Sequence, residues 1–508
     1  MNAKAAAKYL IFVFLLAFAL LFFLLAADLL LGVSKDKNTW RPPFAPGVAL
    51  DASGLDPVTV AETVRLSPDS VQALEQLHEA WQRARAQGLK IAIAGARHSM
   101  GDQSAYPNGI IIDMLDHNSM RLDSLSGEDG KQMVLHVETG ARWSQVIQFL
   151  DTRGYSVRIM QANNPFTVGG TLSVNAHGWQ HGQPPFGSTV EAFDLFTADG
   201  TVKHCDRREN AELFHLVIGG YGLFGVVLDA DLRITQNVVY RAEHFRFPAR
   251  EYARQYAEHV DGDTSLGLVY GRLSIAPSSF LREAILTRYV KQNGIAPELK
   301  PDGGGMTLSM WIKRELFLAA VGNDFGKEVC WQLEKWVGGE SEDNATRNSI
   351  LNDPVTLAEN HDSTRTQLLH EYFIPRDSLE SFLVQARRII PEHGGDLLNV
   401  TVRNLRADTD AYLNYAREDV FSLVMTFSQA ATPQGDSGMR EMTRALIDAA
   451  LAVRGTYYLP YRRHATRDQF FRAYPMAASF FTLKRKYDPQ ELFQNELYAG
   501  YALPEDPK

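Results

Sequence analysis

The first strong helical pattern of the chain begins near residue 67 and ends at Gly88. The stretch 67–69 (Ser-Pro-Asp) places a capping serine before a proline at the first helical position, which is a helix start signal. Apolar residues then recur every three or four positions, as a helix with one buried face requires: Val71, Leu74, Leu77, Trp81 and Ala84. Glycine commonly ends helices, so we predict a helix from about residue 70 to Gly88.

Short apolar runs with strand-like alternation follow this helix. Three of them are predicted strands: 90–96 (KIAIAGA), Ile110–Asp113 and Val134–Glu138. A helix is predicted over Trp143–Arg153, ended by Gly154. This alternation up to about residue 235 predicts a mixed sheet with helices, as in an α+β ligand-binding domain. From about 240 to 450 the predicted elements are longer, for example over 376–390, and indicate a second domain.

The N-terminus carries a long apolar run. Residues Tyr9–Ala27 are nineteen positions without a charge, and Leu29–Leu31 extend the run. As a helix, nineteen residues rise about 28 Å, close to the roughly 30 Å hydrocarbon core of a bilayer. We therefore expect a retained single-pass membrane anchor over residues 9–31 and a tether over 32–56. A cleaved signal peptide and a buried core helix are the alternatives, and basic residues on both sides leave the orientation open.

Composition narrows the class of protein. The chain has 508 residues, of which 45% are hydrophobic and 22% charged, and this balance is typical of globular proteins. A net charge of −9 disfavours a general nucleic-acid binder. The two cysteines, Cys205 and Cys330, form no CxxC and no cluster with histidines at zinc spacing, so we predict no metal site.

Two glycine-bearing loops are candidates for ligand binding. The first is Gly95–Gly101 (GARHSMG), directly after a predicted strand, and the second is Thr167–Gly178 (TVGGTLSVNAHG). Adjacent glycines let the backbone approach a ligand closely, and amides in such turns point at anions, so the pair is suited to a pyrophosphate. By composition alone, glycine-rich loops of this kind are more often plain turns than ligand-binding loops.

A third glycine cluster imitates a dinucleotide fingerprint. Residues 220–225 (GYGLFG) satisfy GxGxxG, which in a Rossmann fold is followed by a helix. Here apolar and polar residues alternate over 226–234, which predicts a strand instead. A Rossmann NAD site is therefore disfavoured.

The order of several motifs resembles the vanillyl-alcohol-oxidase-type (PCMH-type) FAD-binding oxidoreductases. The motifs are ARHSMGDQ at 96–103, GxxW at 140–143, TVGGTLSVNAHG at 167–178, GGYGLFGVV at 219–227, HEYFIP at 370–375, AYP at 473–475 and DPQELFQNEL at 488–497. The aldonolactone and alditol oxidases and the decaprenylphosphoryl-ribose oxidases look most similar. The resemblance covers about residues 57 to 500.

The resemblance implies an α+β fold in several parts. These are a two-subdomain PCMH-type FAD-binding domain over 57–236, an α+β substrate or cap domain over 237–450, and a C-terminal segment over 451–508 that returns to the FAD domain. With the N-terminal transmembrane helix, this is the fold we expect.

The family's motifs also imply which residues contact FAD. In relatives the histidine of the HS pair carries the flavin through a covalent bond, and His98 occupies that position; a hydrogen-bonded loop histidine is the alternative. His177 and Gly178 correspond to a pair that lies beside the flavin. The residues implied in FAD binding are Gly95, Ala96, Arg97, His98, Ser99, Met100, Gly101, Thr167, Gly169, Gly170, Ser173, Asn175, His177, Gly178 and Val226.

The catalytic residues are expected in the second half of the chain. Oxidation of an alcohol by a flavin needs a group that accepts the hydroxyl proton and a cation near the developing negative charge. The likeness places Glu371 at a pocket-lining glutamine of the decaprenylphosphoryl-ribose oxidases and Arg403 at an arginine that aldonolactone oxidases also have. A partly desolvated carboxylate at residue 371 can serve as the base, Arg403 as the cation, and Tyr461 as the group that holds the substrate oxygen. Purely structural roles, Glu371 as an ion-pair partner and Arg403 as a surface charge, are the alternatives. In aldonolactone oxidases an acid stands where this chain has Thr401, and a lysine where it has Tyr461, which puts the lactone substrate in doubt.

These features predict an FAD-linked oxidase or dehydrogenase that acts on a CH–OH donor. The donor would be an aldonolactone such as D-arabinono-1,4-lactone, a polyol or a lipid-linked sugar. Two alternatives stay open at this point, a flavin-dependent reductase of a C=C bond and a non-catalytic flavin-binding protein. The anchor and the loop Gln161–Asn164, which lacks glycine, favour a membrane quinone over O2 as the electron acceptor.

Overall fold

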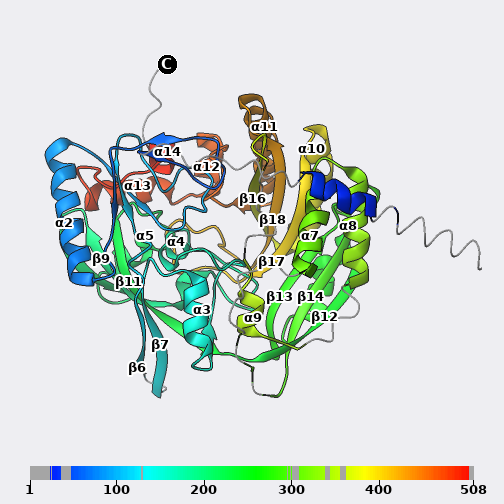
Figure 1. Ribbon diagram of the computed structural model, residues 1–508, viewed down its shortest axis with the longest axis horizontal. Helices are drawn as coiled ribbons and strands as arrows, with labels where there is room; N and C mark the ends of the chain where they lie inside the picture. Colours follow the sequence, from blue (N-terminus) through cyan, green and yellow to red (C-terminus); the bar gives the residue numbers. More distant parts are fainter. Residues whose placement is uncertain are drawn as a thin grey trace, which may run out of the picture.

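The chain folds into two lobes that lie side by side, as Figure 1 shows. The computed structural model describes residues 26–35, 47–127, 130–294, 308–337, 344–354 and 362–502, with the single residues 23, 296, 297 and 299. The first lobe contains two sheets and the second contains one large sheet. A C-terminal group of helices returns to the first lobe.

A small parallel sheet forms one part of the first lobe. Its strand order is β3 (Glu62–Arg65), β5 (Ile110–Asp113) and β4 (Ile91–Ala94), and the hairpin β1 (Val48–Ala49) with β2 (Val58–Thr59) forms a separate two-stranded sheet. Helix α2 (Ser70–Gln87) packs its apolar face against this sheet. Its N-cap is Asp69, whose side chain accepts from the Gln72 amide, so the expectation that Ser67 caps the helix is wrong. Gly88 ends the helix at φ +68°, as predicted.

A larger antiparallel sheet forms the other part of the first lobe. Its strand order is β10 (Val202–Asp206), β9 (Val190–Thr197), β11 (Gly225–Gln236), β7 (Gly130–Glu138) and β6 (Met120–Gly127), and β8 (Tyr155–Val157) pairs with β11. The accompanying helices are α3 (Trp143–Asp151), α4 (Val168–Ser173), η1 (Phe186–Thr189) and α5 (Ala211–Val217). The strand predicted after residue 225 is confirmed as β11. The prediction of one mixed sheet is wrong, because the parallel and the antiparallel strands form separate sheets.

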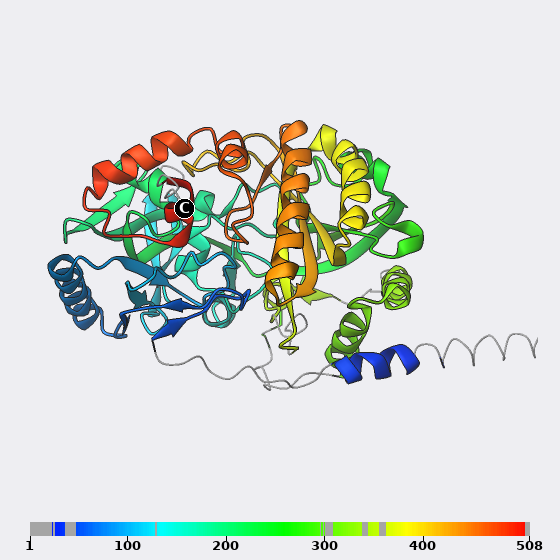
Figure 2. The ribbon, with the colours of Figure 1, turned by 90° about the horizontal axis from the view of Figure 1, so that it is seen from above.

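The second lobe is built on an eight-stranded antiparallel sheet. Its order is β15 (Ala345–Thr346), β12 (Val239–Pro248), β14 (Glu283–Lys291), β13 (Leu266–Leu273), β17 (Asp396–Leu405), β18 (Val420–Ala430), β16 (Arg365–Pro375) and β19 (Thr456–Tyr457). The helices of this lobe are η2 (Ala249–Glu251), α6 (Tyr252–His259), η3 (Pro277–Ser279), α7 (Leu308–Ala320), α8 (Asp324–Val337), α9 (Arg347–Leu351), η5 (Arg376–Ser378), α10 (Leu379–Glu392) and α11 (Pro433–Ala452). Figure 2 shows α10 and α11 side by side; both pack on β16, and α11 also packs on β18.

The C-terminal segment crosses back to the first lobe. After β19 it forms α12 (Arg467–Ala473), α13 (Ala477–Tyr487) and α14 (Glu496–Ala502). Between α13 and α14 the backbone runs beside β4, where the Ile91 amide donates to the Leu492 carbonyl at 2.8 Å and the Gln494 amide donates to the Ile91 carbonyl at 2.9 Å. The last part of the chain therefore extends the parallel sheet that precedes the first glycine loop.

The membrane anchor expected over residues 9–31 is not supported. Within the described residues, no helix combines the length and the apolar character needed to cross a membrane. Residues 26–35 form a helix that lies against α7, where Lys35 Nζ donates to the carbonyl oxygens of Ala319 (3.2 Å) and Val321 (2.5 Å). We therefore correct the predicted transmembrane helix and single-pass localisation, together with the quinone acceptor that was argued from them. Residues 1–22, 24 and 25 lie outside the described part of the chain.

Candidate active site

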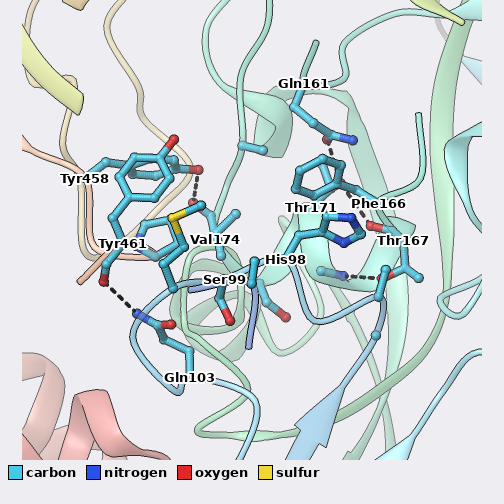
Figure 3. A pocket seen from close by; sticks show the side chains of 18 of the residues that line it. His98, Ser99, Gln103, Gln161, Phe166, Thr167, Thr171, Val174, Tyr458 and Tyr461 are labelled. Atoms are coloured by element: carbon cyan, nitrogen blue, oxygen red, sulfur yellow. Dashed lines mark hydrogen bonds between the residues drawn. The ribbon is translucent and has the colours of Figure 1, made fainter. Parts of the chain in front are cut away.

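A cavity of about 820 Å³ opens where the two lobes meet. The first lobe lines it with the loop after β4, the segment around α4 and the loop before β11. The second lobe lines it with β13, β16, β17 and β18, and the C-terminal segment lines it with Tyr458, Pro460 and Tyr461. In Figure 3, His98 and Phe166 lie on one side of this cavity and Tyr458 and Tyr461 on the other.

The two glycine loops touch each other at the floor of the cavity. Thr167 is the N-cap of α4 and accepts from the Gly170 amide at 3.2 Å. A Cβ atom on Gly95 would lie 2.2 Å from Thr167 Oγ1, so only glycine permits this contact. Arg97, two residues further, has a left-handed backbone (φ +55°), which turns the first loop back along the cavity. The contact between the loops therefore depends on the absence of a side chain at residue 95.

The backbone amides of the first loop are available to an anion. Within the described residues, the amides of Ala96, Arg97 and Ser99 donate no hydrogen bond. At the start of α4, by contrast, the Gly169 amide donates to the Thr139 carbonyl at 2.8 Å and the Gly170 amide to its own cap. Three amides of the first loop are thus available to a phosphate, while those of Met100 and Gly101 and the first amides of the second loop are already used. Phosphate binding by either loop stays a prediction.

These features fit a large dinucleotide cofactor. The cavity volume lies within the roughly 300–1,000 Å³ range of small-molecule and cofactor sites. Free amides in a tight turn satisfy a pyrophosphate without a lysine. The His98 ring lines the same cavity and packs against Phe166, with ring centroids 4.4 Å apart.

A buried carboxylate lies in the wall contributed by the second lobe. Glu371 on β16 is 2% exposed, and both of its oxygens are engaged. Its Oε2 accepts from the Tyr461 hydroxyl at 3.0 Å, and its Oε1 accepts from Ser422 Oγ and lies 2.5 Å from His177 Nε2. Arg403 on β17, which β18 separates from β16, donates from Nη1 to the His177 carbonyl at 3.2 Å. The three residues predicted as catalytic thus meet at one place, and His177 joins them.

The environment shifts the pKa values of this cluster in opposite directions. Burial alone would raise the pKa of Glu371, but His177, Arg403 and Ser422 together hold it below its ordinary value. Burial lowers the pKa of His177 despite the neighbouring carboxylate, so the imidazole is neutral. Burial and the charge of Glu371 raise the pKa of Tyr461 well above its ordinary value. The cluster therefore holds an anionic carboxylate, a neutral imidazole and a protonated phenol.

Aromatic side chains enclose the imidazole of His177. Its ring centroid lies 5.4 Å from that of Phe373, 5.9 Å from Tyr458 and 6.0 Å from Tyr415. Tyr458 donates from its hydroxyl to the Val174 carbonyl at 2.9 Å, which ties the C-terminal segment to the second glycine loop. This packing fixes the imidazole between the two lobes.

Most of the predicted site residues line the cavity. They are Gly95, Ala96, Arg97, His98, Ser99, Met100, Thr167, Gly169, Gly170, Ser173, His177, Glu371, Arg403 and Tyr461. Four others lie behind its wall: Gly101, Asn175, Gly178 and Val226. A Cβ on Gly178 would lie 2.0 Å from the Met160 carbonyl oxygen, and the Asn175 side chain bonds Asp408 and the Gly187 amide. These four support the loops in the structure, and their contact with FAD stays a prediction.

Several cavity residues were not predicted from the sequence: Phe166, Trp179, Arg272, Asn399 and Tyr458. Tyr458 was the easiest of them to predict, because it lies three residues before Tyr461 in the same motif, YYLPY. Arg272 on β13 lines the cavity while its Nε donates to Glu334 of α8 at 2.6 Å. No sequence motif near Arg272 predicts it as a site residue. The pairing of β13 with β17 places it at the cavity.

Metal and disulfide chemistry find no support in the described residues. No group of three or more His, Cys, Asp or Glu side chains there is placed to hold a metal ion. Cys205 and Cys330 are both free thiols.

Comparison with known proteins identifies an FAD binding domain within the chain. Residues 70–206 match the family model described as an FAD binding domain, and this range contains both glycine loops. The motif order predicted an FAD-binding domain, and the match confirms it over this range.

Several curated relatives match parts of the chain. An uncharacterised oxidoreductase of the fasciation locus of Rhodococcoides fascians is 30% identical over 47% of the chain and 52% of its own length. Decaprenylphosphoryl-β-D-ribose oxidase of Mycolicibacterium smegmatis is 31% identical over 30% of the chain and 33% of its own. Cytokinin dehydrogenase 1 of Arabidopsis thaliana is 30% identical over 29% of the chain and 25% of its own. The chain thus spans about half or less of these relatives, whose names do not support the narrower likeness to arabinonolactone oxidases.

Proposed function

We propose that this FAD-binding oxidoreductase oxidises a CH–OH group of a small, sugar-derived substrate. The observation that carries the proposal is the position of Glu371 and Tyr461. Both line the cavity wall of the second lobe, opposite the loop whose free amides suit the FAD pyrophosphate. A proton acceptor and a hydroxyl-binding group thus share one enclosed space with the cofactor site, as alcohol oxidation requires.

Each side chain of the cluster has a distinct part in this reaction. FAD, which the two glycine loops would hold, would supply the acceptor for the hydride of the carbinol carbon. Tyr461 holds the substrate oxygen through its hydroxyl, and Glu371, anionic and within hydrogen-bond distance of that hydroxyl, receives the proton. Arg403 supplies positive charge beside the cluster and is held by the His177 carbonyl. Such fixed charges stabilise the charge that develops during the reaction.

We further propose that His98 carries FAD covalently. Its ring lines the cavity in the loop directly after β4, and it packs against Phe166 on the side away from Tyr461. This position is compatible with a bond to the flavin ring while the substrate occupies the other side.

The substrate class follows from the cluster and from the relatives. The names of two relatives refer to a lipid-linked ribose and to cytokinins, so both sugar CH–OH and amine donors belong in any screen. The phenol and carboxylate pair favours an alcohol, because a hydroxyl proton has a direct acceptor there. Sugar lactones, alditols and prenyl-phosphate sugars are therefore the first donors to test.

The experiment is an anaerobic bleaching test on the FAD-loaded protein. Under the proposal, a CH–OH donor bleaches the visible flavin absorbance, and Glu371→Gln slows the bleaching while flavin stays bound. Bleaching by NADPH alone would indicate a C=C reductase. A spectrum that no donor changes would indicate a non-catalytic flavin-binding protein, and either result overturns the proposal.

A further inference from the structure

The carboxylate of Glu371 is contacted from three separate segments of the chain: Ser422 and Tyr461 donate hydrogen bonds to it, and His177 Nε2 lies 2.5 Å from its Oε1. Ser422 lies on β18, His177 follows α4 in the first lobe, and Tyr461 belongs to the C-terminal segment. Ser422 is completely buried and His177 is 3% exposed. The register of β18 places Ser422 opposite both Phe373 on β16 and Arg403 on β17. Glu371 is two residues before Phe373, so its side chain lies on the same face of the sheet as that of Ser422. The strand register therefore brings Ser422 next to Glu371.

The two oxygens of this carboxylate have different surroundings. Ser422 and His177 both contact Oε1, and Ser422 is not among the residues that line the cavity. Among the described residues, Tyr461, which does line the cavity, donates to Oε2. Oε1 thus has a donor from behind the cavity wall, and Oε2 is directed at the group that meets the substrate. Ser422 can act on the reaction only through Glu371.

We propose that Ser422 and His177 are positioning residues that keep Glu371 ionised in one orientation, with Oε2 directed at Tyr461. The role of Glu371 as a base rests on the proposed function, whereas the contacts of Ser422 and His177 with Glu371 do not depend on it. It gives His177 a role different from the FAD contact that the family motif implies. Its imidazole contacts the base while its carbonyl accepts from Arg403, so a single residue joins the two charged groups of the cluster.

The physical reason is the cost of a buried charge. An isolated carboxylate at this depth would take up a proton, because burial disfavours the charged form. Hydrogen bonds donated to the carboxylate favour the charged form and hold it in place. The titratable or charged groups that face Glu371 are His177, Tyr221, Arg403, Tyr415, Tyr458, Tyr461 and Tyr474. Among them Arg403 is the one permanent cation. Ser422 adds a hydrogen bond donated directly to the carboxylate, and His177 lies beside the same oxygen.

The test is an infrared pH titration of the FAD-loaded protein without substrate. A protonated, buried Glu371 gives a carboxylic acid C=O band that is missing in Glu371→Gln. In Ser422→Ala we expect this band to appear at higher pH, with a proton affinity raised about tenfold, which is one pKa unit. His177→Gln, which can still donate to Glu371, should shift the band less than His177→Leu and retain bound FAD.

Ser428→Ala is the matched control. Ser428 lies on the same strand and is buried, but its Oγ accepts from Arg365 and it does not line the cavity. A band that stays in place in Ser422→Ala, or that moves equally in Ser428→Ala, would overturn the inference. Loss of FAD from His177→Gln with an unchanged band would return His177 to cofactor binding. If the bands move as expected but no donor bleaches the flavin, the positioning role stands and the proposed function fails.

Discussion

At the scale of single residues, the central feature is a carboxylate whose protonation is controlled by its neighbours. Glu371 keeps a low pKa in a buried position because donors surround it. A weakly basic carboxylate is a poor acceptor for an isolated alcohol. It becomes an adequate one when the hydroxyl of Tyr461 binds the substrate oxygen and the proton moves as the hydride leaves. The chemistry therefore depends on the pair and not on Glu371 alone.

The first prediction concerns the rate of flavin reduction. Glu371→Gln and Arg403→Ala should each retain bound FAD and slow its reduction by an effective donor by about 10²-fold or more, the usual scale for positioned proton transfer and charge stabilisation. Stopped-flow absorbance under anaerobic conditions measures it. Glu380→Gln, which removes an exposed ion-pair partner of Arg387 on α10, is the control and should leave the rate unchanged. Wild-type rates in both site variants would remove these residues from the mechanism.

The second prediction concerns the attachment of FAD. Wild-type protein should stay yellow after acid precipitation, because a covalent bond to His98 survives denaturation. His98→Ala should release FAD into the supernatant. His78→Ala, on α2 and outside the cavity, should behave like the wild type. Free FAD in the wild-type supernatant would contradict the covalent bond.

Only part of this cluster could be predicted from the sequence. Glu371, Arg403 and Tyr461 stand at positions that the family motifs mark, although the lysine and acid of aldonolactone oxidases are replaced here. Ser422 carries no motif, and its role depends on the register between β18 and its two neighbours. Pairing across a sheet is not visible in a single sequence, because the partner strands lie about fifty and twenty residues away.

At the scale of elements, the contact between the first glycine loop and α4 forms the cofactor site. Alternation and glycine stops predicted β4, β5 and α3 to within a few residues, because buried strands and helices carry their own periodicity. The division into a parallel and an antiparallel sheet was not predicted, since periodicity does not encode strand order. The N-cap of α2 is Asp69 and not the predicted Ser67. Both residue types commonly cap helices, so the sequence alone did not decide between them.

The third prediction tests that loop contact. Gly95→Ala places a Cβ 2.2 Å from Thr167 Oγ1 and should displace the loop, weakening FAD binding by at least about tenfold and lowering Tm. Gly438→Ala is the control, since this exposed helical glycine has nothing within 4 Å of an added Cβ and the change should stabilise α11 by about 1 kcal/mol. Fluorescence titration with FAD and thermal unfolding measure both effects. Unchanged FAD affinity in Gly95→Ala would contradict the loop geometry.

The fourth prediction concerns the residue that follows the same loop. Burial, then the charges of Asp51 and Asp56, raise the pKa of Asp102 to about 7. The folded state therefore binds more protons than the unfolded chain between about pH 4 and 7, and stability falls as pH rises through that window. Asp102→Asn cannot ionise and suits the positive φ of 58° at this position, so it should be more stable than wild type at pH 8.

Urea unfolding at pH 5 and pH 8 measures this effect. The stability that wild type loses between these two pH values should exceed the loss in Asp102→Asn by about 2 kcal/mol. The comparison isolates Asp102 because other titrating groups are common to both proteins. Equal losses in the two proteins would show that Asp102 ionises normally.

At the scale of the whole molecule, the site exists only where three parts of the chain meet. The first lobe supplies the glycine loops, the sheet of the second lobe supplies Glu371 and Arg403, and the C-terminal segment supplies Tyr461. The C-terminal segment also contacts the first lobe at two places. The Met100 amide donates to the Pro460 carbonyl at 2.8 Å, and the backbone after α13 pairs with β4 and extends its sheet. The motif order anticipated this return of the chain. The apolar run at the N-terminus, judged on length and charge alone, led to an anchor that the described residues do not support.

The most direct test of the central claim is a crystal structure of the protein loaded with FAD. We expect the pyrophosphate at the amides of Ala96–Ser99 and the flavin ring between His98 and the Glu371–Tyr461 pair, with space for a substrate beside Tyr461. A flavin ring bound away from this pair, or a ring that seals Tyr461 off from the cavity, would contradict the claim that the two lobes form one oxidising site.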